Sequence, residues 1–220
     1  MGYFPFFVEL EGKRGVIVGG GTVAARKVEK LLAFGPKLTV IAPDIEACVR
    51  TQGELLQKDA AGSLRFEERA FRMEDLDDAD FVIAATDDTV LNGEIANHCR
   101  ESRIPVNVAD DREKCTFFFP ALVREGSLTV GISTDGKSPL AASWVRREIA
   151  GMLPESIGEI IDLLGQIRPA VMALEAEESD RKKWFERLFI YCMERLDRGQ
   201  EITEKELTKL VEAWRHKENE

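Results

Sequence analysis

The sequence predicts an α/β protein in which a parallel sheet covered by helices is followed by a hairpin with a helix, and then by an all-helical region. Three observations predict this order. Short apolar runs alternate with helical patterns through the first half of the chain, as in parallel sheets with both faces covered. Two extended runs around a glycine turn come next. From Pro154 onward, apolar residues recur only at helical spacing. The predicted domains are therefore 1–113, 114–150 and 151–220.

Five short strands are predicted in the first domain, each rich in β-branched residues and bounded by turn or charge signals. They lie at 15–19, 37–43, 64–69, 80–86 and 104–110. Apolar residues at helical spacing predict helices over 23–34 and 89–102, and Gly35 is a stop signal for the first of these helices. Strands that alternate with helices in this way predict a parallel sheet.

The second predicted domain begins with the runs "CTFFFPALV" and "SLTVGIST", joined by "REGS". Extended runs around a glycine-containing turn predict an antiparallel hairpin. Pro120 lacks an N–H donor, which favours an edge or bulged position for the first strand. A helix is predicted over 138–153, with Ser138 as its N-cap and Pro139 at its first position.

Two stripes of apolar residues at helical spacing predict packed helices in the third domain. The stripes comprise Ile157, Ile160, Ile161, Leu164 and Ile167, and then Trp184, Phe185, Leu188, Phe189 and Cys192. Thr203 followed by Glu206 predicts a capping box at the start of the last helix. The acidic stretch at 175–183 is interpreted as a solvated connection between helices.

Composition limits the partners and the location of the chain. The formal net charge of −10 disfavours a general nucleic-acid partner, because neutralising phosphates needs a basic surface. No run approaches the apolar length of a membrane span, and the first residues lack the pattern of a signal peptide. The four cysteines lie far apart, as expected for reduced thiols. These features predict a cytoplasmic protein that binds neither nucleic acid nor membrane.

The stretch "VIVGGGTVAARK" joins the first strand to the first helix and carries a G-x-G-x-x-A pattern. Gly19 allows a sharp turn, Gly21 allows a pyrophosphate to approach the backbone, and Ala24 allows the helix to pack near the sheet. The amide groups of Thr22 and Val23 then lie at a helix N-terminus, where anions bind. Strand, loop and helix in this order predict a dinucleotide site of the Rossmann type.

The acidic residue that usually contacts the adenosine ribose is missing from the end of the second strand, where Ile41 and Ala42 stand. Asp44 lies slightly further along, and it is a candidate either for the ribose contact or for capping the next turn. No arginine or lysine follows the strand closely, so a 2′-phosphate lacks an obvious partner. NAD is therefore expected in preference to NADP.

Carboxylates follow two other predicted strands, at the edge where parallel sheets meet their ligands. Asp110 ends one strand, and Asp87 and Asp88 follow another. At least one of the latter two is expected to cap the next helix. Asn107 and Asp111 are expected to support Asp110, and repulsion between the Asp110 and Asp111 carboxylates is a candidate cause of a raised pKa.

Four segments together carry a family resemblance: "FPFFVELEGKRGVIVGGGTVAARKVEKLL", "AATDD", "NVAD" and "GISTDGKSPLAASWVRREI". In order and spacing they resemble the precorrin-2 dehydrogenase/sirohydrochlorin ferrochelatase module of sirohaem synthases, over about residues 3–150. The helical tail resembles that family more loosely. The resemblance implies oxidation of the tetrapyrrole precorrin-2 to sirohydrochlorin with NAD, followed in many members by insertion of Fe²⁺ to form sirohaem.

The resemblance also implies residue roles. The catalytic aspartate of the family matches Asp110, and cofactor contacts fall on Thr22–Val23 and Pro43–Asp44. A homodimer is implied, with much of its contact from about 114–150. Thr134 stands where some members carry a serine that is phosphorylated. Together with the loop and strand-end residues, the expected cofactor contacts are Gly19, Gly21, Thr22, Val23, Pro43, Asp44, Thr86 and Asp87.

A polycarboxylate substrate needs basic partners, and six residues are candidates: Arg112, Lys114, Arg124, Lys137, Arg146 and Arg147. No cluster of histidine and cysteine has metal-ligand spacing, so no resident metal is expected and Fe²⁺ would be a substrate. Asp110 is then the candidate to accept pyrrole protons and contact the metal.

Two other functions fit the glycine loop: a Rossmann-type ligand-sensing module without catalysis, and a dehydrogenase for another small metabolite.

Overall fold

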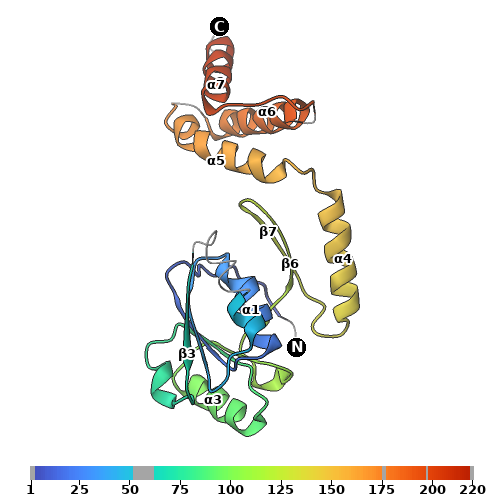
Figure 1. Cartoon of the computed structure of the whole chain (residues 1–220). Helices are drawn as coiled ribbons and strands as arrows, with labels where there is room; N and C mark the ends of the chain where they lie inside the picture. Colours follow the sequence, from blue (N-terminus) through green and yellow to red (C-terminus); the bar gives the residue numbers. More distant parts are fainter. Residues whose placement is uncertain (1–2, 52–61, 175–176, 197, 219–220) are drawn as a thin grey trace. The chain divides into compact units, whose positions relative to one another are not determined.

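The computed structural model describes residues 3–51, 62–174, 177–196 and 198–218 (Figure 1). The chain forms two compact units. One unit is Phe6–Phe119, and the other combines the residues up to Pro5 with those from Pro120 onward. The first unit carries the glycine loop, and the second carries the hairpin and the C-terminal helices.

A five-stranded sheet with the order β3-β2-β1-β4-β5 forms the centre of the first unit, and every neighbouring pair is parallel. The strands are β1 (Arg14–Val18), β2 (Lys37–Ala42), β3 (Ser63–Glu68), β4 (Phe81–Ala84) and β5 (Val106–Val108). Helix α1 (Thr22–Leu32) connects β1 to β2, and α3 (Thr89–Glu101) connects β4 to β5. Short 3₁₀ helices lie at Met73–Leu76 and Arg112–Lys114. The predicted parallel α/β fold is therefore confirmed.

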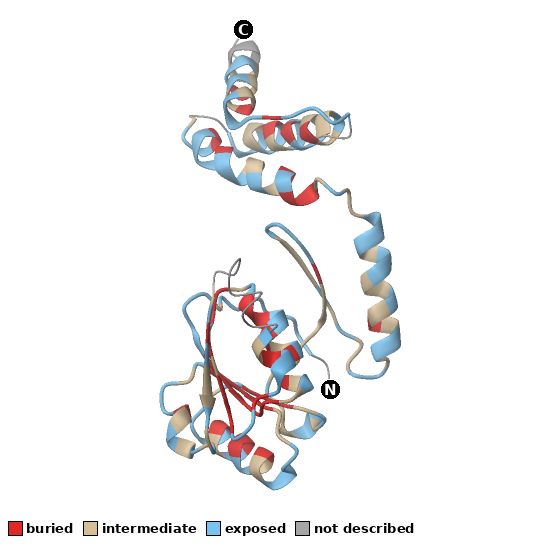
Figure 2. Ribbon diagram, viewed as in Figure 1, coloured by how far each residue is buried: buried red, intermediate tan, exposed pale blue. Residues whose placement is uncertain are grey.

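Alternation along the strands divides the core of this unit between the two faces of the sheet (Figure 2). In β1, Ile17 packs with α1, whereas Val16 and Val18 pack with α3 on the other face. Because both faces are covered, the strands read as nearly continuous apolar runs. Gly35 has a φ of +80° and its amide bonds to the carbonyl of Leu32, so it ends α1 as the sequence predicted.

The second unit begins with an antiparallel hairpin of β6 (Ala121–Glu125) and β7 (Leu128–Ile132), in which Val123 pairs with Val130. Gly126 makes the turn with a φ of +56°. Helix α4 (Pro139–Met152) follows, and the Ser138 side chain accepts a hydrogen bond from the amide of Ala141, as the cap prediction required. The hairpin and its helix are confirmed.

The first hairpin strand is shorter than predicted. Residues 115–120 do not belong to β6, because Phe117 and Phe119 pack against the core of the first unit and Pro120 has no amide hydrogen for a ladder bond. The run "CTFFF" (115–119) is instead the segment that ends the first unit. Aromatic composition alone did not distinguish a strand from a core-packed loop.

Helices α5 (Ile157–Met172), α6 (Glu178–Leu196) and α7 (Glu204–Glu218) form the rest of the second unit. Their shared core contains half of the residues in the two predicted stripes, namely Ile160, Ile167, Trp184, Leu188 and Cys192, and Leu164 and Phe185 pack against it. Val171, Ile202, Leu207 and Val211 complete the buried cluster. The predicted connection at 175–183 is largely wrong, because α6 already begins at Glu178; residues 175 and 176 lie outside the described residues. The charged residues from Glu178 to Lys183 instead form the first turns of α6.

The predicted capping box of α7 is only half formed. The amide of Glu206 donates to the Thr203 hydroxyl over 3.3 Å, as predicted. The Glu206 carboxylate instead accepts hydrogen bonds from the Tyr191 hydroxyl at 2.6 Å and from Arg195 at 3.3 Å. Contacts with α6 therefore replace the local bond back to Thr203.

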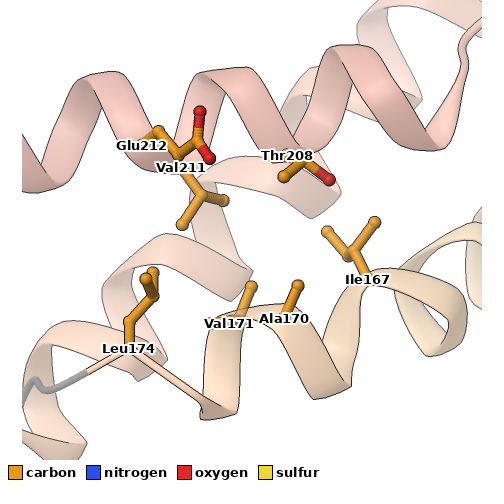
Figure 3. Close-up of a pocket in the computed structure, with 7 residues that line it drawn as sticks. All are labelled: Ile167, Ala170, Val171, Leu174, Thr208, Val211 and Glu212. Atoms are coloured by element: carbon orange, nitrogen blue, oxygen red, sulfur yellow. The ribbon is translucent and has the colours of Figure 1, made fainter.

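A small pocket of about 60 Å³ lies between α5 and α7 (Figure 3). Its lining is Ile167, Ala170, Val171, Leu174, Thr208, Val211 and Glu212. A volume of this size holds one or two water molecules and is far too small for a tetrapyrrole.

Within the described part of the chain, no helix has the length and apolar character needed to cross a membrane.

Candidate dinucleotide and catalytic site

The glycine loop is packed between the ends of β2 and β4. Gly19 has a φ of +120°, and a β-carbon added there would lie 2.2 Å from the carbonyl oxygen of Ala85. Its amide donates to the carbonyl of Ile41 over 2.9 Å. A β-carbon on Gly20 would lie 2.2 Å from the carbonyl oxygen of Asp44. Only glycine therefore fits these two positions, for conformation at Gly19 and for space at both.

The N-terminus of α1 suits an anionic ligand. Gly21 is the N-cap and has no side chain to occupy the first amides, and the first turn contains no acidic residue. Thr22 and Val23 are the first two helical residues. Ala24 is fully buried, so the helix packs closely on the sheet as its small side chain predicted. This cradle fits the pyrophosphate of NAD or NADP.

The segment after β2 folds back over the glycine loop. Pro43 and Asp44 are exposed, and Asp44 meets the loop through its backbone carbonyl. The amide of Glu46 donates to the carbonyl of Gly20 over 3.0 Å. Glu46 is not among the residues chosen from the sequence, because it lies four positions beyond the end of β2. Its position next to Gly20 depends on how the chain turns after Asp44.

The segment after β4 is built around Asn92, a buried polar residue of α3. The Asn92 side-chain oxygen accepts from the Thr86 hydroxyl at 2.8 Å, and its amide donates to the Thr86 carbonyl at 2.9 Å. Asp88 caps α3 by accepting from the amides of Val90 and Leu91. Capping is therefore the role of Asp88, and Asp87 is the exposed carboxylate next to it.

Asp110 follows β5 at the same carboxyl edge of the sheet. It is exposed and has a φ of +59°, a conformation that aspartate tolerates better than most residues. The neighbouring Asp111 forms an ion pair with Lys114 at 2.8 Å, and this hydrogen bond holds the pKa of Asp111 below its usual value. The predicted raising of one pKa within an Asp110–Asp111 pair is thus wrong for Asp111, because a cation stabilises its charge.

Asn107 and Lys27 form a contact that the sequence did not predict. Asn107 lies on β5 with 6% of its surface exposed, and its side-chain oxygen accepts a hydrogen bond from the Lys27 Nζ at 3.1 Å. The Asn107 amide donates to the carbonyl of Phe117 at 3.0 Å. Lys27 Nζ also lies 3.8 Å from the centre of the Phe119 ring. Burial, followed by repulsion from Lys30, lowers the pKa of Lys27 to about 8.

Cys115 links the segment that follows Asp110 to β5 by hydrogen bonds. Its sulfur accepts from the amide of Val108 at 3.2 Å, and its thiol lies 3.2 Å from the carbonyl of Asp111. The Asn107 amide nitrogen is 3.5 Å from the same sulfur. Asn107 and Cys115 together hold residues 109–119 against β5. The predicted supporting role of Asn107 therefore has a structural basis.

The six basic candidates are divided between the two units. In the first unit, Lys114 pairs with Asp111 and Arg112 lies 5.1 Å from the centre of the Phe118 ring. The remaining four, Arg124, Lys137, Arg146 and Arg147, belong to the second unit.

Thr134 is half-buried, and its hydroxyl donates to the carbonyl of Ser138 at 3.0 Å. Its position is at the start of α4.

The structure gathers the predicted residues of the first unit at one edge of the sheet. The glycine loop follows β1, Asp44 follows β2, Asp87 follows β4 and Asp110 follows β5. Because all four strands are parallel, these segments share the carboxyl edge. Among the described residues, no group of three or more histidine, cysteine, aspartate or glutamate side chains is arranged to hold a metal ion.

The sheet order, the glycine loop and the N-terminus of α1 define a dinucleotide-binding protein of the Rossmann type. More particularly, the chain belongs to the family described as "Putative NAD(P)-binding", whose model matches residues 6–121. A second family model, described as sirohaem biosynthesis protein central, matches residues 125–152. The two matches cover the sheet unit and the hairpin with its helix.

Related proteins agree with this membership. The chain is 38% identical to a siroheme synthase of Photorhabdus laumondii over 86% of this chain and 39% of that protein. It is 32% identical to a siroheme synthase of Neisseria meningitidis serogroup C over 96% of this chain and 43% of that protein. The chain thus spans about two fifths of the length of these relatives. The family resemblance inferred from the sequence is confirmed.

A solved structure, SirC, precorrin-2 dehydrogenase, is similar along its whole length. It has a TM-score of 0.69 and 25% sequence identity, and the match covers 96% of this chain and all of that chain. The likeness therefore includes the helices of the second unit as well as the sheet. It also confirms the predicted order of sheet, hairpin and helical region.

Proposed function

We propose that this chain oxidises precorrin-2 to sirohydrochlorin and uses NAD as the hydride acceptor. The observation that carries the proposal is the position of Asp110, an exposed carboxylate on the same edge of the sheet as the glycine loop. The match to all of a precorrin-2 dehydrogenase chain supports the choice of substrate. The names of the siroheme synthases support the same chemistry.

The oxidation removes a hydride and a proton from the substrate. NAD, when bound, accepts the hydride, and its pyrophosphate would be held by the amides of Thr22 and Val23. Asp110 accepts the proton as a general base. Lys27 and Asn107 hold the segment that carries Asp110, and the positive charge of Lys27 lies near enough to interact with Asp110. The chain thus supplies the base and a fixed frame around it.

The remaining expected contacts are assigned as follows. Gly19 makes the turn of the loop and Gly21 allows the dinucleotide to approach the backbone. Pro43, Asp44, Thr86 and Asp87 border the dinucleotide at the ends of β2 and β4. NAD rather than NADP is proposed because Arg50, the first basic residue after β2, is paired with Glu68 and lies over Phe66. A 2′-phosphate therefore lacks a ready cation.

The chain is proposed to form a homodimer, with much of the contact from about residues 114–150. A two-stranded sheet is marginal alone, and β6 and β7 form such a sheet. Helix α4 exposes 77% of Leu140, 54% of Trp144 and 81% of Met152. Apolar residues exposed in this number on one segment are typical of a protein interface. The basic side chains of the same unit, Arg124, Lys137, Arg146 and Arg147, are proposed to neutralise substrate carboxylates.

Iron insertion is proposed as a second activity of the same site. The siroheme synthases to which the chain is similar support it by name. Asp110 would accept the pyrrole protons and contact Fe²⁺, which is a substrate here.

The proposed location is the cytoplasm, where the four free cysteines stay reduced.

The test is an assay of the purified chain with enzymatically prepared precorrin-2 and NAD, followed by the absorbance of NADH and of sirohydrochlorin. Turnover is expected. NAD binding without turnover would favour a ligand-sensing module, and turnover of a different metabolite would indicate another dehydrogenase. A separate arm with sirohydrochlorin and Fe²⁺ or Co²⁺ tests insertion, with the spontaneous reaction subtracted.

A further inference from the structure

Glu46 brings a carboxylate to the glycine loop from outside the position where a ribose contact is usually sought. A β-carbon built on Gly21 would lie 3.3 Å from Oε1 of Glu46. The backbone of Glu46 is fixed at the same place, because its amide donates to the carbonyl of Gly20 at 3.0 Å. Gly21 is the N-cap of α1, so this carboxylate stands beside the pyrophosphate cradle.

The other carboxylate oxygen of Glu46 has a different partner. The thiol of Cys48 donates to Oε2 at 3.3 Å. Partial desolvation and the hydrogen bond to Glu46 raise the pKa of this thiol, so it remains a donor at neutral pH. The side chain of Glu46 is therefore held by its neighbour with Oε1 next to Gly21. Asp44, in contrast, approaches the loop through its carbonyl.

We propose that Glu46 is the residue that accepts a hydrogen bond from the adenosine ribose of NAD. The inference rests on the dinucleotide binding within the proposed function and deepens it. In Rossmann sites an acidic side chain near the glycine turn bonds the ribose 2′-hydroxyl. In this chain β2 ends in Ile41 and Ala42, and the turn after β2 returns Glu46 to the glycine loop, where its amide bonds to Gly20 and its carboxylate lies beside Gly21.

The same residue explains the preference for NAD by repulsion. The 2′-phosphate of NADP would bring negative charge next to the carboxylate of Glu46. Repulsion between these like charges would oppose the binding of NADP. Arg50 lies one turn beyond Glu46, but its guanidinium is paired with Glu68 and lies over the ring of Phe66. Glu46 is thus both the attractive contact for NAD and the repulsive contact for NADP.

The test is Glu46→Gln, which keeps the size of the side chain and removes its charge. NAD and NADP are titrated separately into the wild-type and variant chains by calorimetry. We expect the variant to bind NAD about tenfold more weakly and to bind NADP at least as tightly as the wild type does. Glu29→Gln is the matched control, because Glu29 is an exposed glutamate of α1, and both of its affinities should equal those of the wild type.

Three results would overturn the inference. The first is an unchanged ratio of NAD to NADP affinity in Glu46→Gln. The second is tighter binding of both nucleotides, which would mean that the carboxylate competes with the pyrophosphate for the amides of α1. The third is loss of NAD affinity in Asp44→Asn but not in Glu46→Gln, which would assign the ribose to Asp44.

The titrations contain no tetrapyrrole, so this inference and the proposed reaction fail separately. A wild-type chain that binds NAD through Glu46 but does not oxidise precorrin-2 would refute the reaction and support the ribose contact. Turnover of precorrin-2 by the wild type, together with unchanged nucleotide affinities in Glu46→Gln, would support the reaction and refute the ribose contact. A wild-type chain that binds neither nucleotide would overturn both.

Discussion

The Nζ atom of Lys27 lies 3.1 Å from Oδ1 of Asn107, and this hydrogen bond joins the first helix of the sheet unit to its last strand. Helix α1 presents the glycine loop, and Asn107 holds the segment after Asp110 through the carbonyl of Phe117. One contact therefore links the proposed dinucleotide cradle to the proposed base. Residues far apart in the chain become parts of one site through this link.

The first prediction concerns the pH dependence of turnover. Lys27 has a pKa of about 8, below its ordinary value of 10.5, because burial and Lys30 disfavour the charged form while Cys115 and Asp110 favour it. Lys27 is therefore cationic below pH 8 and loses its attraction for Asp110 as the pH rises through 8. Turnover of the wild type should decline over that interval. Lys27→Arg stays charged, so its profile should lack the decline.

The control for this experiment is Lys30→Arg, which keeps a positive charge beside Lys27 and should preserve the decline. Equal declines in the wild type and in Lys27→Arg would contradict the assignment. The same lowered pKa has a consequence for stability. Between about pH 8 and 10.5 the unfolded chain binds the Lys27 proton more tightly, so the contribution of Lys27 to the free energy of unfolding should rise with pH over this interval.

The second prediction concerns Asp110. Asp110→Asn keeps the shape of the side chain and removes the base, so the rate of precorrin-2 oxidation should fall by about 10²–10⁴-fold. NAD affinity should change little, because the proposed cofactor contacts lie mainly in the glycine loop. Steady-state kinetics and an NAD titration on one preparation measure both quantities. Asp77→Asn, an exposed aspartate after the first 3₁₀ helix, is the control. Near-normal turnover of Asp110→Asn would exclude Asp110 as the base.

The third prediction concerns cofactor choice in the wild-type chain. NAD⁺ should bind more tightly than NADP⁺, because the first basic residue after β2, Arg50, is engaged by Glu68. Calorimetric titration of each nucleotide measures the difference. The preference should weaken when Glu68→Gln releases Arg50. Equal or tighter binding of NADP⁺ by the wild type would show that the choice of NAD is wrong.

The fourth prediction concerns assembly. The chain should be a dimer in solution, because α4 exposes Leu140, Trp144 and Met152 and the hairpin has only two strands. Light scattering over a range of concentrations gives the mass. Trp144→Glu should shift the mass towards the monomer, while Glu148→Gln on the same helix should not. A monomer mass at every concentration of the wild type would remove the argument for a dimer.

The fifth prediction concerns the stability of the segment after β4. Asn92→Ala should lower the free energy of unfolding by about 1–3 kcal/mol, because the amide and carbonyl of Thr86 lose their buried partner. Chemical denaturation followed by far-ultraviolet circular dichroism measures this loss. Asn97 lies exposed on the same helix, and Asn97→Ala should change the stability by less than about 0.5 kcal/mol. Equal stabilities of the two variants would contradict the prediction.

The sequence by itself determined the elements and their order. Gly19, Gly21 and Ala24 predicted the turn and the close helix, because local geometry at each position admits few residue types. Ser138 and Pro139 predicted the start of α4, and the observed cap confirms it. The glycine loop, the alternation of strands and helices and the helical C-terminal region follow from local backbone preference and the spacing of apolar residues. The resemblance to one family followed from these same segments.

The tertiary structure decided which side chains meet. Lys27 and Asn107 are 80 residues apart, and their contact depends on how α1 lies against β5. Glu46 reaches Gly21 because the chain turns back after Asp44, which no spacing rule predicts. Long-range packing also separates residues from their predicted local partners. Phe117 and Phe119 pack against the core of the first unit and not in the hairpin, and the Glu206 carboxylate bonds with α6 and not with the amide of Thr203. Local patterns report what the backbone prefers, whereas these contacts depend on burial and charge that exist only after distant segments have packed together.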